Sequence, residues 1–86
     1  MSQKINIEHA PNAVLYTRAG CHLCDDAEQL LLQYGIAPKI VDIDEDAELK
    51  TRFGMSVPVV EIGGRVRFRG RVNTVLLRRI LRHHRE

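Results

Sequence analysis

The sequence lacks the features of a membrane or secreted protein. None of its hydrophobic runs approaches the roughly 20 residues that a membrane-spanning helix needs, and the N-terminal segment MSQKINIEHAPN has no apolar stretch typical of a signal peptide. The chain also has no internal repeat and no low-complexity segment. Its 86 residues, 44% hydrophobic and 28% charged, suit one soluble globular domain. We therefore expect a cytoplasmic protein without a membrane partner, in a compartment where thiols are kept reduced.

Cysteine is scarce, and both cysteines lie in the segment CHLC at positions 21–24. A closed zinc site needs four ligands, and the sequence has no second cysteine pair to complete one. The remaining candidates are the four histidines His9, His22, His83 and His84. His22 is poorly placed beside both cysteines, and a histidine pair near a helix end is more often exposed. Two close cysteines can also be small core residues. The spacing Cys-x-x-Cys between a strand and a helix instead favours a redox pair.

Acidic residues are almost missing from the C-terminal part of the chain. Residues 65–86 contain eight arginines and one acid, whereas residues 1–64 contain 5 basic and 10 acidic side chains. This asymmetry indicates either an anionic partner or a solvated basic face. A nucleic acid is not expected, because the basic part offers no aromatic stacking position besides Phe68, which its pattern buries.

The first half of the chain predicts a strand, a helix and a second strand. Residues 12–17 are apolar and β-rich, and Cys21 opens an amphipathic helix that Gly35 ends. Apolar residues recur on one face of that helix at helical spacing: Leu23, Ala27, Leu30, Leu31 and Tyr34. Residues 37–44 predict the second strand, and residues 45–54 predict a short helix with an acidic start.

The second half predicts a hairpin followed by a helix. Residues 59–62 form a strand, and Gly63-Gly64 turns it into a partner strand that begins at Arg65. The alternation in that partner strand places Val66 and Phe68 inward and the arginines outward. The last helix is capped by Asn73, with Val72 and Leu77 as a hydrophobic staple. We expect its positions Leu76, Leu77 and Ile80 to face the core.

The predicted order is βαβαββα over residues 12–86, after a flexible N-terminal lead of residues 1–11. Strands joined through a helix run parallel by right-handed crossover, and a hairpin adds an antiparallel edge. The expected fold is α/β, with a four-stranded mixed sheet and helices on both faces.

The position of Cys21 at a helix start predicts its chemistry. The free N–H groups of the first helical turn point at its sulfur and lower the pKa of the thiol from about 8.5. Cys24 lies one turn deeper, within disulfide reach. Cys21 is therefore the predicted nucleophile toward a substrate disulfide, and Cys24 the thiol that resolves the mixed disulfide.

Three segments together resemble the small glutaredoxin-like proteins of the thioredoxin superfamily: VLYTRAGCHLC, then SVPVVEIGGR, then a terminal helix. The resemblance covers nearly all of the chain from about residue 12. It implies a thioredoxin-like fold, thiol–disulfide oxidoreductase activity and a cis Val57–Pro58 bond against the cysteines. It also implies that the backbone of Val57 pairs with the substrate, and that Arg18 binds the glycyl carboxylate of glutathione.

The sequence departs from the family pattern at two places near the predicted site. The usual Pro-Tyr between the cysteines is His22-Leu23; a protonated His22 would stabilise the thiolate, and otherwise it is an exposed residue at the helix start. The usual second glycine and acidic pair after the hairpin are missing, since Gly70 is followed by Arg71-Val72-Asn73. In the family this acidic pair holds the amino end of glutathione, so its absence argues against specificity for glutathione, which stays a possible co-substrate. The basic hairpin and last helix also differ from a neutral glutathione site and suit an acidic protein instead.

We expect a monomer that acts on a disulfide-bearing protein or on glutathione, with no resident cofactor and no bound metal. The electron donor is either glutathione or a reductase. Two alternatives remain from other classes. In one, Cys21 and outside thiols hold an iron–sulfur cluster or a metal between two chains; in the other, the chain is a redox-linked protein-binding domain.

Overall fold

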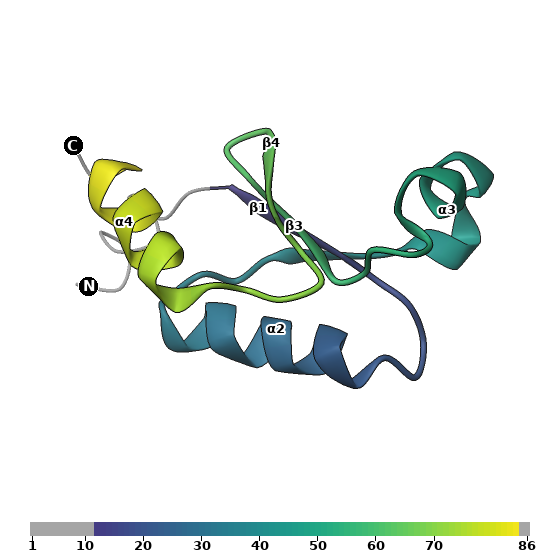
Figure 1. The fold of residues 1–86 in the computed structure, drawn as a ribbon, viewed down its shortest axis with the longest axis horizontal. Helices are drawn as coiled ribbons and strands as arrows, with labels where there is room; N and C mark the ends of the chain where they lie inside the picture. Colours follow the sequence, from purple (N-terminus) through teal and green to yellow (C-terminus); the bar gives the residue numbers. More distant parts are fainter. Residues whose placement is uncertain (1–11, 85–86) are drawn as a thin grey trace.

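The computed structural model describes residues 12–84, and the predicted flexible lead of residues 1–11 lies outside them. Three α-helices and four strands follow in the predicted order βαβαββα (Figure 1). In chain order the elements are β1 (Ala13–Thr17), α2 (His22–Gln33), β2 (Lys39–Asp42), the 3-10 turn η1 (Ile43–Glu45), α3 (Ala47–Phe53), β3 (Val59–Ile62), β4 (Arg65–Arg69) and α4 (Thr74–His84). No described helix has the length and apolar character required to cross a bilayer.

The strands form one mixed sheet in the order β2-β1-β3-β4. β1 pairs in parallel with β2 and antiparallel with β3, and β3 pairs antiparallel with β4. The hairpin turn between β3 and β4 consists of Gly63 and Gly64, both at positive φ (63° and 84°), as a type I′ turn requires. Because of this pairing, the end of β1, the start of β3 and the end of β4 lie at the same end of the sheet.

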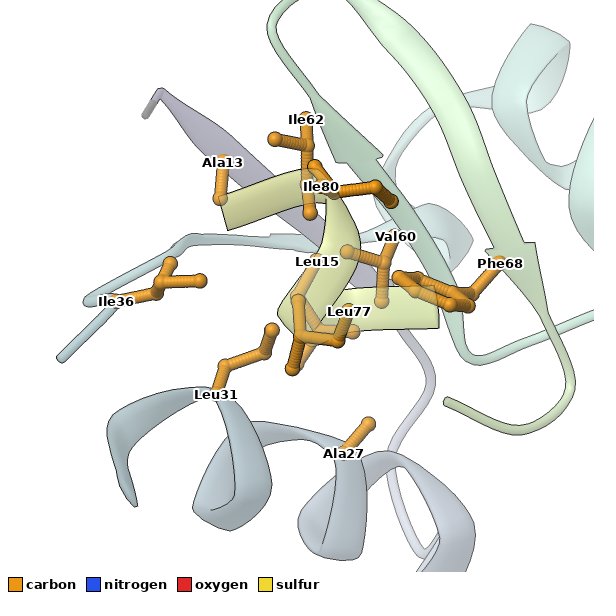
Figure 2. Close-up of a cluster of buried hydrophobic side chains, with 10 residues drawn as sticks. All are labelled: Ala13, Leu15, Ala27, Leu31, Ile36, Val60, Ile62, Phe68, Leu77 and Ile80. Atoms are coloured by element: carbon orange, nitrogen blue, oxygen red, sulfur yellow. The ribbon is translucent and has the colours of Figure 1, made fainter. Parts of the chain in front are cut away.

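One face of the sheet is covered by α2 and α4 around the larger core (Figure 2). Ala27 and Leu31 point from α2 toward Leu15 of the central strand β1, and Leu77 enters the same space from α4. The core of this face consists of Ala13, Leu15, Ala27, Leu31, Ile36, Val60, Ile62, Phe68, Leu77 and Ile80. Burial of these apolar side chains fixes both helices on the sheet.

The opposite face carries a smaller core beneath α3. Ile43, Phe53 and Val59 are buried there, and the ring of Tyr16 lies 4.8 Å from that of Phe53. Burial, followed by the negative charge of the neighbouring Glu61, raises the pKa of the Tyr16 hydroxyl. The prediction of helices on both faces is thus confirmed.

A β-bulge corrects the expectation that Val66 and Phe68 share a face. Phe68 is paired with Val60 but Val66 with Glu61, so the register shifts by one residue between them. Phe68 consequently packs in the core beneath α2 and α4, whereas Val66 packs in the core beneath α3. The extra residue, Arg67, has no Cα partner in the ladder.

Two predicted core residues are exposed instead. Leu23, in the first turn of α2, is 45% exposed, and Leu76 of α4 is 37% exposed. The core beneath α2 and α4 contains Ala27 and Leu31 of α2 and Leu77 and Ile80 of α4, but neither Leu23 nor Leu76. Adjacent Leu77 is completely buried, and the predicted cap and staple of α4 are present: Asn73 Oδ1 accepts from the Leu76 N–H at 3.0 Å, and Val72 packs on the core.

The predicted boundaries around residue 44 also shift. The strand ends at Asp42, whose carboxylate accepts the Asp44 N–H at 2.9 Å and starts η1. Asp46 then caps α3 by accepting from the N–H groups of Glu48 and Leu49. Asp side chains that bond their own downstream backbone favour turns and helix starts over strands, so the helix begins after, rather than within, the acidic run.

We expect Leu77→Ala to lower the free energy of unfolding by about 2–5 kcal/mol, because it leaves a cavity between α4 and the sheet. The matched control is Leu76→Ala on the same helix, which should cost about 1 kcal/mol at most, since surface substitutions have small effects. Chemical denaturation of both variants measures the difference. Equal losses would contradict the assignment of Leu77 to the core.

Candidate active site

Cys21 is the N-cap residue of α2, at the point where β1 has ended and the helix begins. Its backbone is extended (φ −94°, ψ 106°), and its Sγ accepts the Cys24 N–H at 3.1 Å. Its carbonyl accepts the first helical bond, from the Asp25 N–H at 3.2 Å. The sulfur therefore occupies the place where a helix start offers unpaired N–H donors, as predicted.

The two cysteines are joined in a disulfide, with their Cα atoms 5.2 Å apart. Their environments differ: Cys21 is half-buried, whereas Cys24 is 2% exposed. In this state neither sulfur is a thiolate that could bind a metal. Within residues 12–83 no group of three or more His, Cys, Asp or Glu side chains is arranged to hold a metal ion. His22, next to Cys21, is exposed.

Val57 and Pro58 directly precede β3 and lie at the same end of the sheet as the end of β1. Their peptide bond is cis, as the resemblance implied, and Pro58 is fully buried. The Pro58 carbonyl accepts the Gly70 N–H at 2.7 Å, which ties the segment to the end of β4. The Val57 side chain packs on the core beneath α3, and no backbone hydrogen bond joins Val57 to any other described residue.

Arg18 is bound to the protein itself. Its Nη2 lies 2.9 Å from Asp44 Oδ1, and its Nε bonds both carboxylate oxygens at 3.2 Å. Its Nη1 donates to the Gly54 carbonyl at 3.1 Å. This set of contacts, the Arg18–Asp44 clamp, fastens the loop before Cys21 to η1 and to the end of α3. Hydrogen bonds from Arg18, supported by the positive charges of Arg18 and Lys50, lower the pKa of Asp44.

Asp44 is the site residue that sequence reasoning missed. It belongs to the acidic run 42–46, in which the sequence offers no sign that one carboxylate faces an arginine 26 residues earlier. The sequence does contain one signal for this contact. A single basic residue, Arg18, follows the first strand, and several acids follow the parallel second strand. Parallel strands place their carboxyl ends side by side.

A shallow hollow lies beside the redox pair. It has a volume of about 230 Å³ and is lined by Leu23, Asp26, Ala27, Leu30, Gly70, Arg71 and Val72. Exposed Leu23, one of these lining residues, lies between Cys21 and Cys24 in the sequence. The segment after β4 and the first turns of α2 thus meet next to the disulfide.

A protein-family model and several solved structures are similar to this chain. Residues 12–82 match the model of the Glutaredoxin-like domain (DUF836). The chain belongs to this glutaredoxin-like family. Among solved structures, target protein XcR50 of X. campestris is 37% identical, with a TM-score of 0.70 over 83% of this chain and 96% of that one. The holo form of glutaredoxin C1 from Populus tremula x tremuloides is 26% identical, with a TM-score of 0.63 over 96% and 97% of the two chains.

The fold of this glutaredoxin-like chain is therefore thioredoxin-like, as the resemblance predicted. Buckwheat glutaredoxin in complex with glutathione shares the fold at 17% identity, with a TM-score of 0.58 over 98% of this chain and 79% of that one. The family and the Cys21–Cys24 disulfide together support a redox function of the thiols.

The Arg18–Asp44 clamp predicts a pH-dependent contribution to stability. Because the folded state lowers the pKa of Asp44, its contribution is complete above the ordinary aspartate value of about 3.9 and disappears as the pH falls through the lower folded value. Urea unfolding of Asp44→Asn should show a stability deficit from pH 5 to 8 that shrinks upon acidification below the ordinary aspartate value of about 3.9.

Glu45→Gln is the control for this experiment, since it removes a neighbouring exposed charge that forms no ion pair within residues 12–83. It should show no comparable deficit. A deficit of Asp44→Asn that persists unchanged at pH 2 would contradict the clamp.

Proposed function

We propose that this glutaredoxin-like protein is a thiol–disulfide oxidoreductase that uses a dithiol mechanism. The observation that carries the proposal is the asymmetric pair at the start of α2: a half-buried Cys21 bonded to a buried Cys24. Exchange between two thiols and a disulfide needs one accessible attacking sulfur and one protected resolving sulfur in reach of it. This pair meets both requirements.

In the first step the reduced Cys21 attacks as a thiolate. The Cys24 N–H already points at its sulfur, and a donor of this kind stabilises the negative charge and holds the thiol pKa below the free value of about 8.5. Attack of Cys21 Sγ on the RS sulfur of a substrate disulfide RS–SR′ forms the mixed disulfide Cys21 Sγ–SR, breaks the RS–SR′ bond and releases R′S⁻. The leaving group departs as a thiolate and takes up a proton from solvent.

In the second step Cys24 resolves the mixed disulfide. Its thiolate attacks Cys21 Sγ, forms the Cys21–Cys24 disulfide and releases RS⁻. Two electrons have then passed from the protein dithiol to the substrate. The burial of Cys24 restricts outside disulfides from reaching it first. A thiol such as glutathione, or a reductase, must return two electrons for another turnover, which suits the reducing cytoplasm that we expect.

The backbone of Val57 is positioned to align the substrate. Its N–H and carbonyl form no hydrogen bond with other described residues, and they lie at the same end of the sheet as the end of β1. An extended peptide can pair with such unpaired main-chain groups by hydrogen bonds. Pro58 supports this role because it is buried and anchored by Gly70.

The charges around the pair favour a protein disulfide over glutathione. The guanidinium of Arg18 is already bonded to Asp44 and to the Gly54 carbonyl, so an outside carboxylate would have to displace an internal one. After Gly70 the chain supplies Arg71 to the hollow beside Leu23, and the acid among the hollow's lining residues is Asp26 of α2 rather than an acidic pair after Gly70. Arg69 lies on the other face, 5.5 Å from the Phe53 ring centroid. An acidic protein surface fits this arrangement.

The two cysteines should behave differently when each is replaced. Cys21→Ser should abolish disulfide reduction. Cys24→Ser should retain the first step and accumulate mixed disulfides with a protein substrate, visible by mass spectrometry of the intact adduct. The alkylation rate of Cys24→Ser against pH should report a thiol pKa below about 8.5. A thiol pKa at or above about 8.5 would refute the assignment of Cys21 as the attacking thiol. Mixed disulfides on Cys24 in Cys21→Ser would reverse the roles of the two cysteines.

The two substrate classes predict different arginine variants. With an acidic protein disulfide, Arg71→Glu should lower kcat/KM about tenfold at low salt, and the loss should shrink as salt screens charges over about 10 Å at 0.1 M. Arg82→Glu, an exposed charge reversal on α4, is the matched control. If Arg18→Ala instead causes the largest loss of kcat/KM, and only toward glutathionylated substrates, the protein is specific for glutathione. Unchanged rates in all variants would show that these arginines only aid solubility.

A further inference from the structure

A second and larger hollow, hereafter the α4 groove, lies at the opposite end of the molecule. It has a volume of about 440 Å³ and runs between α4 and the β3–β4 hairpin. One of its residues, Ile62, pairs with Ala13 at the start of β1, whereas Cys21 follows the end of that strand. Four residues of strand separate the two places by roughly 13 Å, and Figure 1 shows α4 and the β1–α2 loop at opposite ends of the long axis.

The α4 groove has an apolar base and a basic edge. Ile62 and Ile80 are buried, and partly exposed Leu76 extends their surface toward solvent. The exposed edge of the groove is formed by the basic residues Arg67, Arg79 and His83. No acid among the described residues lines the groove, and within residues 12–83 neither arginine has an ion-pair partner.

Two features of the backbone create this combination. The β-bulge inserts Arg67 between Val66 and Phe68, which brings its side chain to the α4 side of the hairpin, where it lines the groove. On α4 the groove residues Leu76, Arg79, Ile80 and His83 recur at i, i+3, i+4 and i+7, which is one helix face. Ile80 is also a core residue, so this face borders the buried stripe of α4, and its other members, Leu76, Arg79 and His83, are exposed.

We propose that the α4 groove binds an acidic peptide segment of a partner protein, in which an aliphatic side chain is flanked by Asp or Glu. The aliphatic side chain would lie on Ile62, Leu76 and Ile80. The flanking carboxylates would bond Arg67 and Arg79, for which the planar guanidinium offers two-pronged geometry. The groove's volume is in the range that binds small organic groups.

The surrounding charge favours an extended peptide over a nucleic acid. Arginines continue beyond the groove at exposed positions of β4 and α4, such as Arg65 and Arg82, so the attraction reaches past a single carboxylate. Single-stranded nucleic acids are commonly bound by stacking of their bases on exposed aromatic rings. The one aromatic residue of β4, Phe68, is buried, and the base of the groove is aliphatic throughout.

The test is a titration of the ¹⁵N-labelled full-length protein with the peptide acetyl-Glu-Leu-Glu-Leu-Glu-amide. We expect amide shifts at Ile62, Gly63, Leu76 and Ile80, and none at Cys21 or Leu23. The affinity should fall about tenfold between 20 and 200 mM salt. Substitution of both leucines of the peptide by alanine should remove most of the binding, because the apolar base then has no ligand.

The protein variants separate the groove from general basicity. Arg67→Glu/Arg79→Glu should weaken peptide binding at least tenfold, whereas Arg71→Glu/Arg78→Glu removes the same charge outside the groove and should weaken it less than threefold. Disulfide reductase activity toward a substrate that lacks an acidic segment should be unchanged in the groove variant, which keeps this result independent of the redox proposal.

Three results would overturn the proposal. One is the absence of shifts at groove residues with 5 mM peptide. Another is equal weakening in the two double variants, or equal binding of the alanine peptide, since either would reduce the interaction to unspecific charge. The last is tighter binding, at the same groove residues, of a single-stranded oligonucleotide or of vesicles containing anionic lipid, which would assign the basic end to a different class of partner.

Discussion

The site depends on the junction between the buried strand β1 and the start of α2. Leu15 at the middle of β1 is fully buried between two neighbouring strands, which fixes where the strand ends. Ala27 and Leu31 fix α2 on the same core. Cys21 has to bridge these two anchored elements as the N-cap, and its sulfur therefore faces the free N–H groups of the helix. The same turn of helix that presents Cys21 to solvent carries Cys24 inward, which gives the two sulfurs unequal access.

The rest of the site consists of segments that the strand pairing brings to the same end of the sheet as Cys21. β3 starts beside the end of β1, and β4 ends on the other side of β3, so the Val57–Pro58 segment and Gly70 meet at that end of the sheet. The Arg18–Asp44 clamp adds a link on the α3 side. An exposed ion pair contributes little to global stability, but this one, with the bond from Arg18 to the Gly54 carbonyl, restrains the loop that leads to Cys21.

Much of this arrangement follows from local sequence, and the remainder depends on contacts distant in the chain. The order of elements, the Gly63-Gly64 turn and the Asn73 cap are local signals, and the structure contains all three. The cis bond before Pro58 was predictable only through the family resemblance. The bulge at Arg67 could not be read from an alternation of Val and Phe, because register depends on what each face of the sheet packs against. The partner of Arg18 was likewise hidden within an acidic run.

The excess of arginine acquires a structural meaning once the faces are known. Alternation alone would have placed Arg65, Arg67 and Arg69 on one solvent-facing side. The bulge instead sends Arg67 toward α4 and leaves Arg69 over the Phe53 ring on the opposite face. Arg71 belongs to neither, since it lies beside Leu23 near the disulfide. The positive charge is thus divided between the redox end and the α4 groove. A partner with two separated acidic regions, or two different acidic partners, could engage the ends independently, because charges more than about 10 Å apart are largely screened from each other at 0.1 M salt.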